Sequence, residues 1–297
     1  MSKRVIITGD DFGLAVPVNE AIELGFRDGV LTTTSLLVAE AAAADAAQRA
    51  RDNPGLRVGL HLAVCDGRPL LPPSQIQSLV NARGELRSPV LAVVRLWLLG
   101  WSRRQARELD AEIRAQFAAF RATGLTMDHV NGHNNMQLHP AVLPILMRLA
   151  REYGVRAVRV PYEPLLASWR AARHGFLGRL LVWSVMRPWC AHVRRRLIRE
   201  GFIVNDYLFG VFDCGALDGA LLQRIIERLP EGLSEIHCHP ATRRCAELDK
   251  AMPSYGHEAE LGALLDPSVR SALVASGVQV LSGYSSVRPE SRREPRP

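Results

Sequence analysis

Four segments of this sequence place aspartate or histidine at or just after the end of a β-rich run. They are GDDFG at 9–13, GLH at 59–61, DHVNGHNN at 128–135 and HCHP at 237–240. In a parallel α/β fold the carboxyl ends of the strands converge on one face, which is where active sites are built. The sequence therefore predicts that carboxylates and imidazoles from four separate segments meet at one place.

These residue types suit a metal site. Two adjacent carboxylates, Asp10 and Asp11, are costly to bring together unless a cation or a proton lies between them. One carboxylate and two imidazoles bind a divalent ion and leave coordination positions open for water and substrate. Asp11, His61 and one of His129 or His133 would supply that set. Both of the last two could face the metal only if the segment between them were helical.

Simpler interpretations exist for each residue taken alone. An Asp-Asp pair after a strand often caps the next helix, and a single histidine at a strand end is often only a hydrogen-bonded structural residue. The recurrence of both residue types at four strand ends of one pattern favours the metal site. The sequence contains no G-x-S-x-G elbow and no P-loop, so a serine hydrolase and a nucleotide-dependent transferase lack support.

The elements that must position these residues alternate along the chain. Strands are expected at 3–8, 31–38, 57–64, 127–131, 157–160, 234–238 and 278–281, and helices at 17–28, 40–51 and 103–123. The strands are nearly continuous apolar runs, as in a parallel sheet that helices cover on both faces or that closes into a barrel. The alternation predicts an α/β fold.

Composition narrows the class of protein further. The 297 residues are 47% hydrophobic and 23% charged, which excludes a chain disordered throughout. The five cysteines include no C-x-x-C pair, which argues against a disulfide framework and a structural zinc site. The N-terminal apolar run ends in two acids and leaves no room for a signal-peptide core, so we expect a cytoplasmic protein.

The net charge of +7 is concentrated in one segment. Residues 165–200 contain eight arginines and one glutamate, together with Trp169, Trp183 and Trp189. This composition predicts a basic amphipathic helical insertion that contacts an anionic membrane surface. The apolar run 89–101 is too short to cross a membrane but could lie on its surface. The alternative is an ordinary helix whose leucine face packs on the barrel. Nucleic acid is not expected as a partner, because no nucleic-acid-binding module accompanies the arginines.

Several motifs in the same order resemble one known family. They are VIITGDDFGLAVPVNEAI, GVLTTTSLLVA, GLHL at 59–62, DHVNGHNNMQLHP at 128–140 and CHP at 238–240. Together they resemble the YdjC-like carbohydrate deacetylases. The segments PVNEA, LRVGLHLAVCDGRPLLPP and REYGVRAVRVPYEP are most similar to the hopanoid-biosynthesis-associated deacetylases within that family.

The resemblance implies a deformed (β/α) TIM-like barrel with helical insertions. The barrel would be a single domain over residues 1–284, followed by a disordered tail at 285–297. The implied reaction is metal-dependent hydrolysis of the N-acetyl group of a sugar, here an N-acetylglucosaminyl hopanoid. Soluble chitooligosaccharides are the alternative substrate, and a non-catalytic, peripheral membrane-binding barrel is the alternative from another functional class.

The resemblance also implies roles for individual residues. One divalent ion, Mg²⁺ or Zn²⁺, would be held by Asp11, His61 and His133. Asp10 would be the general base, and His239 a general acid or a substrate-orienting residue. His129, Asn131 and His237 would lie around the ligands or contact substrate. Many relatives have aspartate at the position of Asn131 and histidines at those of Asn134, Asn135 and Gln137, so the metal preference is not transferred.

Overall fold

The computed structural model describes residues 2–88 and 102–287, and most of the predicted tail and the apolar run 89–101 lie outside them. Within this part of the chain one parallel sheet has the order β4-β3-β2-β1-β6-β5, and β7 pairs with β1. The strands are β1 (Lys3–Phe12), β2 (Thr33–Leu36), β3 (Arg57–Leu62), β4 (Met127–Gly132), β5 (Tyr207–Phe209), β6 (Gly232–Cys238) and β7 (Gln279–Val280).

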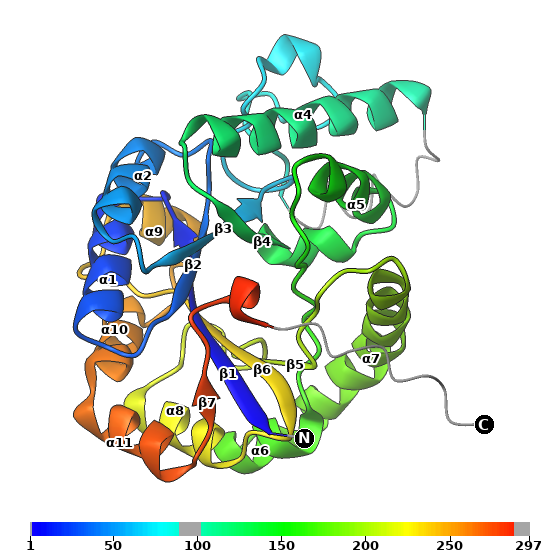
Figure 1. Cartoon of the computed structure of the whole chain (residues 1–297). Helices are drawn as coiled ribbons and strands as arrows, with labels where there is room; N and C mark the ends of the chain where they lie inside the picture. The colour runs from blue at the N-terminus through cyan, green and yellow to red at the C-terminus, as the bar shows by residue number, and fades with distance from the viewer. Residues whose placement is uncertain (1, 89–101, 288–297) are drawn as a thin grey trace.

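The sheet curls into a half-barrel with helices packed around its outside (Figure 1). All the strand pairs are parallel. The segment at 157–160 makes only isolated bridges, Val158 with Val130 of β4 and Ala157 with Ile203. The α/β barrel prediction is therefore confirmed, while the strand expected at 157–160 is wrong, because this segment lacks a continuous ladder on either side.

The helices of the described residues are α1 (Val16–Arg27), α2 (Ala43–Asp52), α4 (Arg103–Ala122), α5 (Val142–Glu152), α6 (Leu165–Ala172), α7 (Phe176–Arg199), α8 (Gly219–Glu227), α9 (Ala246–Ala251), α10 (His257–Leu265) and α11 (Pro267–Ala275). The helices predicted at 17–28, 40–51 and 103–123 correspond to α1, α2 and α4, and their bounds agree to within three residues. The start of α4 illustrates the local cause: the Ser102 side chain accepts a hydrogen bond from the Gln105 amide and caps the first turn. Helix α4 then buries Ile113, Phe117 and Phe120.

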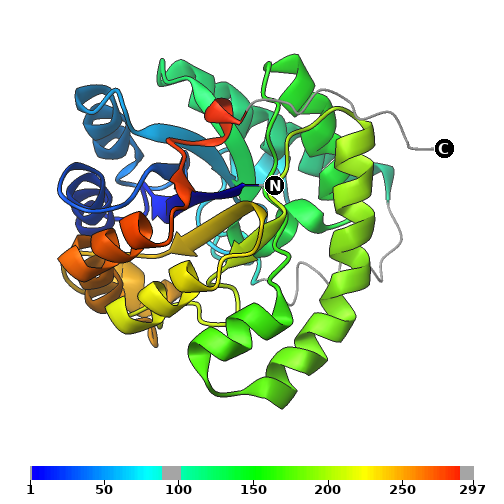
Figure 2. The ribbon, with the colours of Figure 1, turned by 60° about the horizontal axis from the view of Figure 1, so that its bottom comes forward.

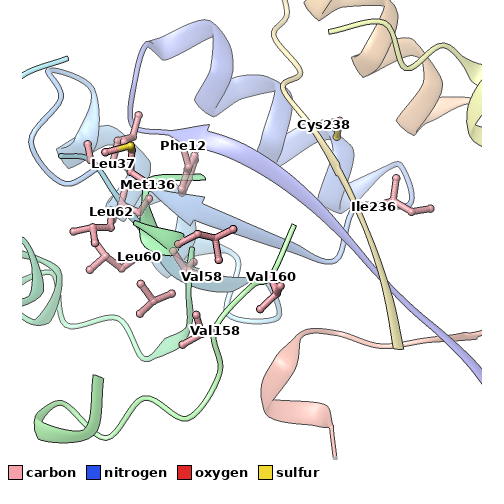
Figure 3. Close-up of a cluster of buried hydrophobic side chains, with 14 of the residues drawn as sticks. Phe12, Leu37, Val58, Leu60, Leu62, Met136, Val158, Val160, Ile236 and Cys238 are labelled. Carbon is pink, nitrogen blue, oxygen red and sulfur yellow. The ribbon is translucent and has the colours of Figure 1, made fainter. Parts of the chain in front are cut away.

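The hydrophobic core surrounds the strands and fixes where they end. Leu60 and Leu62 of β3 are fully buried, and Phe12 at the end of β1 packs in the same cluster (Figure 3). Met136, which follows β4, is also buried there. Because apolar contacts hold these strand ends in place, the polar residues interspersed with them are held in fixed positions too.

The C-terminal segment enters the fold further than the sequence predicts. Tyr284 to Ser286 form a 3₁₀ turn, and the Tyr284 side chain is fully buried. The carboxylate of Asp128 accepts hydrogen bonds from the backbone N–H groups of Tyr284 (2.9 Å) and Ser285 (2.8 Å). The expectation of disorder from Ser285 onwards is thus wrong for 285–287, because these backbone groups have a buried acceptor.

Candidate metal centre

The end of β1 brings two adjacent carboxylates to the same site. Consecutive side chains of a regular strand point to opposite faces. Here the pairing of β1 with β2 shifts register between Gly9 and Phe12, and Asp11 has a φ of 63°. Such left-handed backbone is uncommon for residues other than glycine and is typical of functional sites. Both aspartates are buried, at 2% and 1% exposure.

Asp11 lies between two of the predicted histidines. Its Oδ1 atom is 3.3 Å from Nε2 of His61 and 3.2 Å from Nδ1 of His133. His61 is buried on β3, whereas His133 begins the turn after β4 and is partly exposed. The structure thus brings together the three residues predicted to hold a metal, and of the three only His133 is partly exposed.

Neighbouring side chains fix the orientation of the His61 ring. Its Nδ1 atom is 2.7 Å from Oδ1 of Asn131 and 3.0 Å from Oγ of Ser35. The Asn131 amide donates to Asp10 (3.2 Å), so its oxygen must be the group that faces His61. Nδ1 of His61 therefore donates, and in the neutral ring the lone pair of Nε2 points toward Asp11.

This donor set fits a divalent cation. A lone pair on His61 Nε2 and a carboxylate oxygen on Asp11 are both acceptors, so a cation or a proton must lie between them. Oδ2 of Asp11 is buried and has no hydrogen-bond partner among the described residues. Donors that each lie about 2.1 Å from one ion are roughly 3.0–3.4 Å apart at octahedral or tetrahedral angles, which matches the observed separations. Among the described residues two groups could hold a metal: Asp11, His61 and His133, and beside them Asp10, His237 and His239. The separations above favour the first group, because Asp10 is already paired with Arg159.

Asp10 makes a different set of contacts. Arg159 donates two hydrogen bonds to it, from Nη1 to Oδ2 (2.5 Å) and from Nη2 to Oδ1 (3.0 Å). Ser35 Oγ donates to Oδ1 as well, at 2.8 Å. Burial alone would raise the pKa of Asp10, but Arg159, with smaller contributions from His237 and His61, holds it well below its usual value. Asp10 is therefore a carboxylate at neutral pH.

Buried charges that were not predicted from the sequence lie beneath Asp10. Arg159 also donates to Glu235 of β6, from Nε (2.9 Å) and Nη2 (2.5 Å). Thr8 Oγ1 and the Tyr284 hydroxyl donate to the same carboxylate. A buried arginine between two carboxylates is paired on both sides, so its position is strongly fixed. The only available signal was a lone arginine among the apolar residues of AVRVP.

His237 and His239 lie on the other side of Asp10. Nδ1 of His237 is 3.3 Å from Oδ2 of Asp10, and the rings of His237 and His239 pack edge to face with centroids 5.3 Å apart. His239 also contacts Cys214 and Tyr255. Burial lowers the pKa of His239 to about 4, so this ring is neutral at pH 7.

His129 occupies a different place from the one predicted. It lies two residues before Asn131 on β4, and its ring contacts Asp128 (Nδ1 to Oδ2, 3.1 Å) and Tyr284 (centroids 5.1 Å apart). A Cβ atom on Gly59 would meet this ring at 2.5 Å. His129 therefore packs in the barrel interior instead of beside the candidate ligands, and only His133 of the two histidines lies next to Asp11.

The geometry does not support the simpler explanation that Asp10 and Asp11 cap the next helix. Helix α1 begins after Ala15 without a side-chain cap, so Asp10 and Asp11 do not cap it. Asn134 and Asn135, two of the departures from the family pattern noted in the sequence, adopt left-handed backbone with φ of 52° and 55°. Asparagine tolerates that conformation better than most residues, which gives these two departures a structural reason.

Comparison with known proteins gives a consistent family match. The family model described as YdjC-like protein matches residues 4–275. A chitooligosaccharide deacetylase from Yersinia enterocolitica is 35% identical, covering 96% of this chain and 99% of that protein. A carbohydrate deacetylase from Geobacillus stearothermophilus is 29% identical, covering 95% of this chain and 97% of that protein. Another from Mus musculus is 30% identical over 96% of both chains.

A solved structure supports the fold. A crystal structure from Enterococcus faecalis, named for cellobiose-phosphate cleavage, superposes with a TM-score of 0.72 at 23% sequence identity. The match covers 96% of this chain and 99% of that one. At this level of identity the similarity establishes a shared fold.

Proposed function

This chain belongs to the YdjC-like protein family, and from that premise we propose that it is a metal-dependent hydrolase that removes N-acetyl groups from a carbohydrate. The observation that carries the proposal is the convergence of Asp11, His61 and His133 beside a second buried carboxylate, Asp10. An amide is a poor electrophile, so its hydrolysis requires an activated carbonyl, an activated water molecule and a proton for the departing amine.

The residues of the centre divide into a metal-binding group and a proton-transfer group. Asp11, His61 and His133 would hold one divalent ion, for which Mg²⁺ and Zn²⁺ are the candidates. A divalent ion at such a site polarises a carbonyl oxygen and lowers the pKa of water. Asn131 and Ser35 keep Nδ1 of His61 occupied, so its Nε2 atom remains directed at Asp11.

Asp10 is the proposed general base. Its Oδ1 atom already accepts hydrogen bonds from Arg159, Ser35 and Asn131, whereas Oδ2 accepts one from Arg159 and faces His237. Oδ2 has fewer hydrogen-bond partners than Oδ1, so it is the oxygen that we propose takes a proton from water. The low pKa keeps this oxygen unprotonated before the reaction begins.

His239 is the proposed acid or orienting residue. With a pKa of about 4, its ring is neutral at pH 7 and can donate a single N–H bond. A neutral ring is better suited to orient the substrate or hydrogen-bond a developing oxyanion than to begin the reaction as an imidazolium acid. It would donate a proton to the amine only after receiving one during the reaction.

Substituting Arg159 tests whether it positions Asp10. In Arg159→Lys the charge is retained but the two-pronged contact with Asp10 is lost, because lysine cannot reproduce the planar fork of arginine. We expect kcat to fall about 10- to 100-fold, with KM and metal content nearly unchanged. Steady-state kinetics and metal analysis measure these effects, and a rise in KM with unchanged kcat would contradict a role in positioning the base.

The substrate is proposed at the level of its sugar. An N-acetylglucosamine unit occurs in soluble chitooligosaccharides, named for the relative in Yersinia enterocolitica, and in N-acetylglucosaminyl hopanoid, suggested by the motif resemblance. Acetate release from diacetylchitobiose and from the glycolipid, measured in parallel, separates the two. Activity on the glycolipid alone would support the hopanoid as substrate, activity on diacetylchitobiose would support the soluble sugar, and activity on neither would argue against both.

A further inference from the structure

The first half of α7 exposes an unusual number of apolar side chains. Leu177, Leu181 and Val185 are 78%, 68% and 69% exposed, and they follow one another at a spacing of four residues. Leu180, Val182 and Met186 extend the same surface. We refer to these six side chains as the α7 face. Figure 2 shows α7 as the long yellow-green helix along one side of the molecule.

Polar contacts near both the start and the middle of α7 fix the helix to the body of the protein. Arg179 pairs with Asp213 and donates to Ser168, and all three side chains are buried. Trp189 donates from Nε1 to the backbone carbonyl of Leu138 (3.1 Å). The second half of the helix packs through Cys190, Val193 and Leu197, among other residues. The exposed leucines and valines thus belong to an anchored helix that no described part of the chain covers.

The segment that contains α7 has charged side chains of one sign along the sequence, although Arg179 and Arg194 pair with Asp213 and Asp206 from elsewhere in the chain. Between residues 164 and 199 the sequence has eight arginines and no aspartate or glutamate. Arg170, Arg173 and Arg187 are exposed, and among the described residues no carboxylate forms an ion pair with them. The guanidinium of Arg187 lies over the ring of Trp183, 5.0 Å from its centroid. Cations and an aromatic ring therefore accompany the apolar face.

We propose that the α7 face binds the surface of an anionic lipid bilayer. Such a surface offers acyl chains to the leucines and valines, and negative headgroups to the arginines. A second copy of this chain is a poorer fit, because an isologous contact through α7 would bring two arginine-rich segments together. Binding would be peripheral, since no helix in the described ranges has the length and apolar character needed to span a bilayer.

Docking would place the candidate metal centre close to the bilayer. Two loops anchor α7: the loop after β4 accepts the hydrogen bond from Trp189, and the loop after β5 carries Asp213, the partner of Arg179. The same two loops border the candidate metal centre. The first carries His133, and a Cβ atom on Gly210 in the second would touch His237. This consequence rests on the proposed function, whereas lipid binding itself does not. Membrane docking would give the centre access to a sugar attached to a lipid.

Co-sedimentation of the full chain with vesicles tests the proposal. We expect the protein to bind phosphatidylglycerol/phosphatidylcholine vesicles, and we expect added salt to weaken this binding. Binding to pure phosphatidylcholine vesicles should be weaker by about tenfold or more. The variant L177S/L181S/V185S should lose about tenfold or more of this binding while keeping its melting temperature, because the three side chains are exposed. V274S/V280S is the matched control, since it removes exposed apolar side chains from α11 and β7.

A charge variant gives an independent check. R173Q/R187Q should weaken binding to the anionic vesicles severalfold, whereas R57Q/R156Q, which removes two exposed arginines elsewhere, should not. Equal binding of the wild type to neutral and anionic vesicles, or wild-type binding by L177S/L181S/V185S, would overturn the proposal. So would absence of vesicle binding together with a dimer that this variant abolishes, because the occupant would then be a second copy. Acetate release from a soluble substrate, measured in the same variants, reports separately on the proposed function.

Discussion

Replacing Asp11 with asparagine is expected to reduce both metal content and acetate release to background. The change removes the anionic donor that lies between His61 and His133, and metal binding requires deprotonated ligands. Asparagine has nearly the same shape as aspartate and tolerates the φ of 63° at this position, so the fold should be retained. Plasma mass spectrometry of the purified variant and an acetate assay measure the two effects.

The matched control for this variant is Asp52→Asn. Asp52 is an exposed residue at the end of α2, and its side chain accepts a hydrogen bond from Gln48. It belongs to neither group of candidate ligands, so Asp52→Asn should bind metal and turn over substrate like the wild type. Retention of stoichiometric metal by Asp11→Asn would contradict the assignment of Asp11 as a ligand, even if activity were lost.

Replacing Asp10 with asparagine is expected to separate metal binding from turnover. An amide cannot accept the proton that the carboxylate would take, so kcat should fall about 10²- to 10⁴-fold. The three candidate ligands remain, and metal content should stay near that of the wild type. Acetate release and metal analysis on the same preparation distinguish this result from that of Asp11→Asn.

The same substitution also has a structural consequence. Arg159 is buried and would lose one of its two carboxylate partners, leaving only Glu235. Removing one partner of a buried ion pair costs roughly 3–5 kcal/mol of stability, so the melting temperature should fall. Turnover is therefore measured below the melting transition and per mole of folded protein. Undiminished turnover in Asp10→Asn would exclude Asp10 as the base.

Strands could be predicted from the sequence where apolar runs are long. The prediction failed where strand formation depends on hydrogen bonding to a neighbouring strand. The runs behind β1, β3 and β4 are strands, because each is buried on both faces. Strand β5 has only three residues and leaves no recognisable pattern in the sequence. The run at 157–160 has strand-like composition but makes only isolated bridges. Composition indicates burial, whereas a ladder also depends on neighbours that the local sequence does not specify.

The types of residue in the candidate site could be predicted from the sequence, whereas the buried contacts around them could not. Asp11, His61 and one of His129 or His133 were expected together because chelation restricts the residue types and parallel strands align their ends. The choice of His133 came from the family resemblance. The pairing of Arg159 with Asp10 and Glu235 was not, because a buried arginine is stabilised by partners distant in sequence. His129 was placed beside the ligands because spacing along β4 does not reveal how deep in the barrel a side chain lies. The left-handed backbone of Asp11 and the register shift around it likewise have no recognisable signal in the sequence.

The central claim is that one divalent ion at Asp11, His61 and His133 is required for deacetylation. The most direct measurement is acetate release from an N-acetylglucosaminyl substrate before chelation, after chelator treatment and dialysis, and after stoichiometric Zn²⁺ or Mg²⁺ is restored. We predict that chelation abolishes acetate release in the wild type, that one equivalent of at least one of these ions restores it, and that neither ion restores it in Asp11→Asn. Full acetate release by the chelated, metal-free protein would contradict the account.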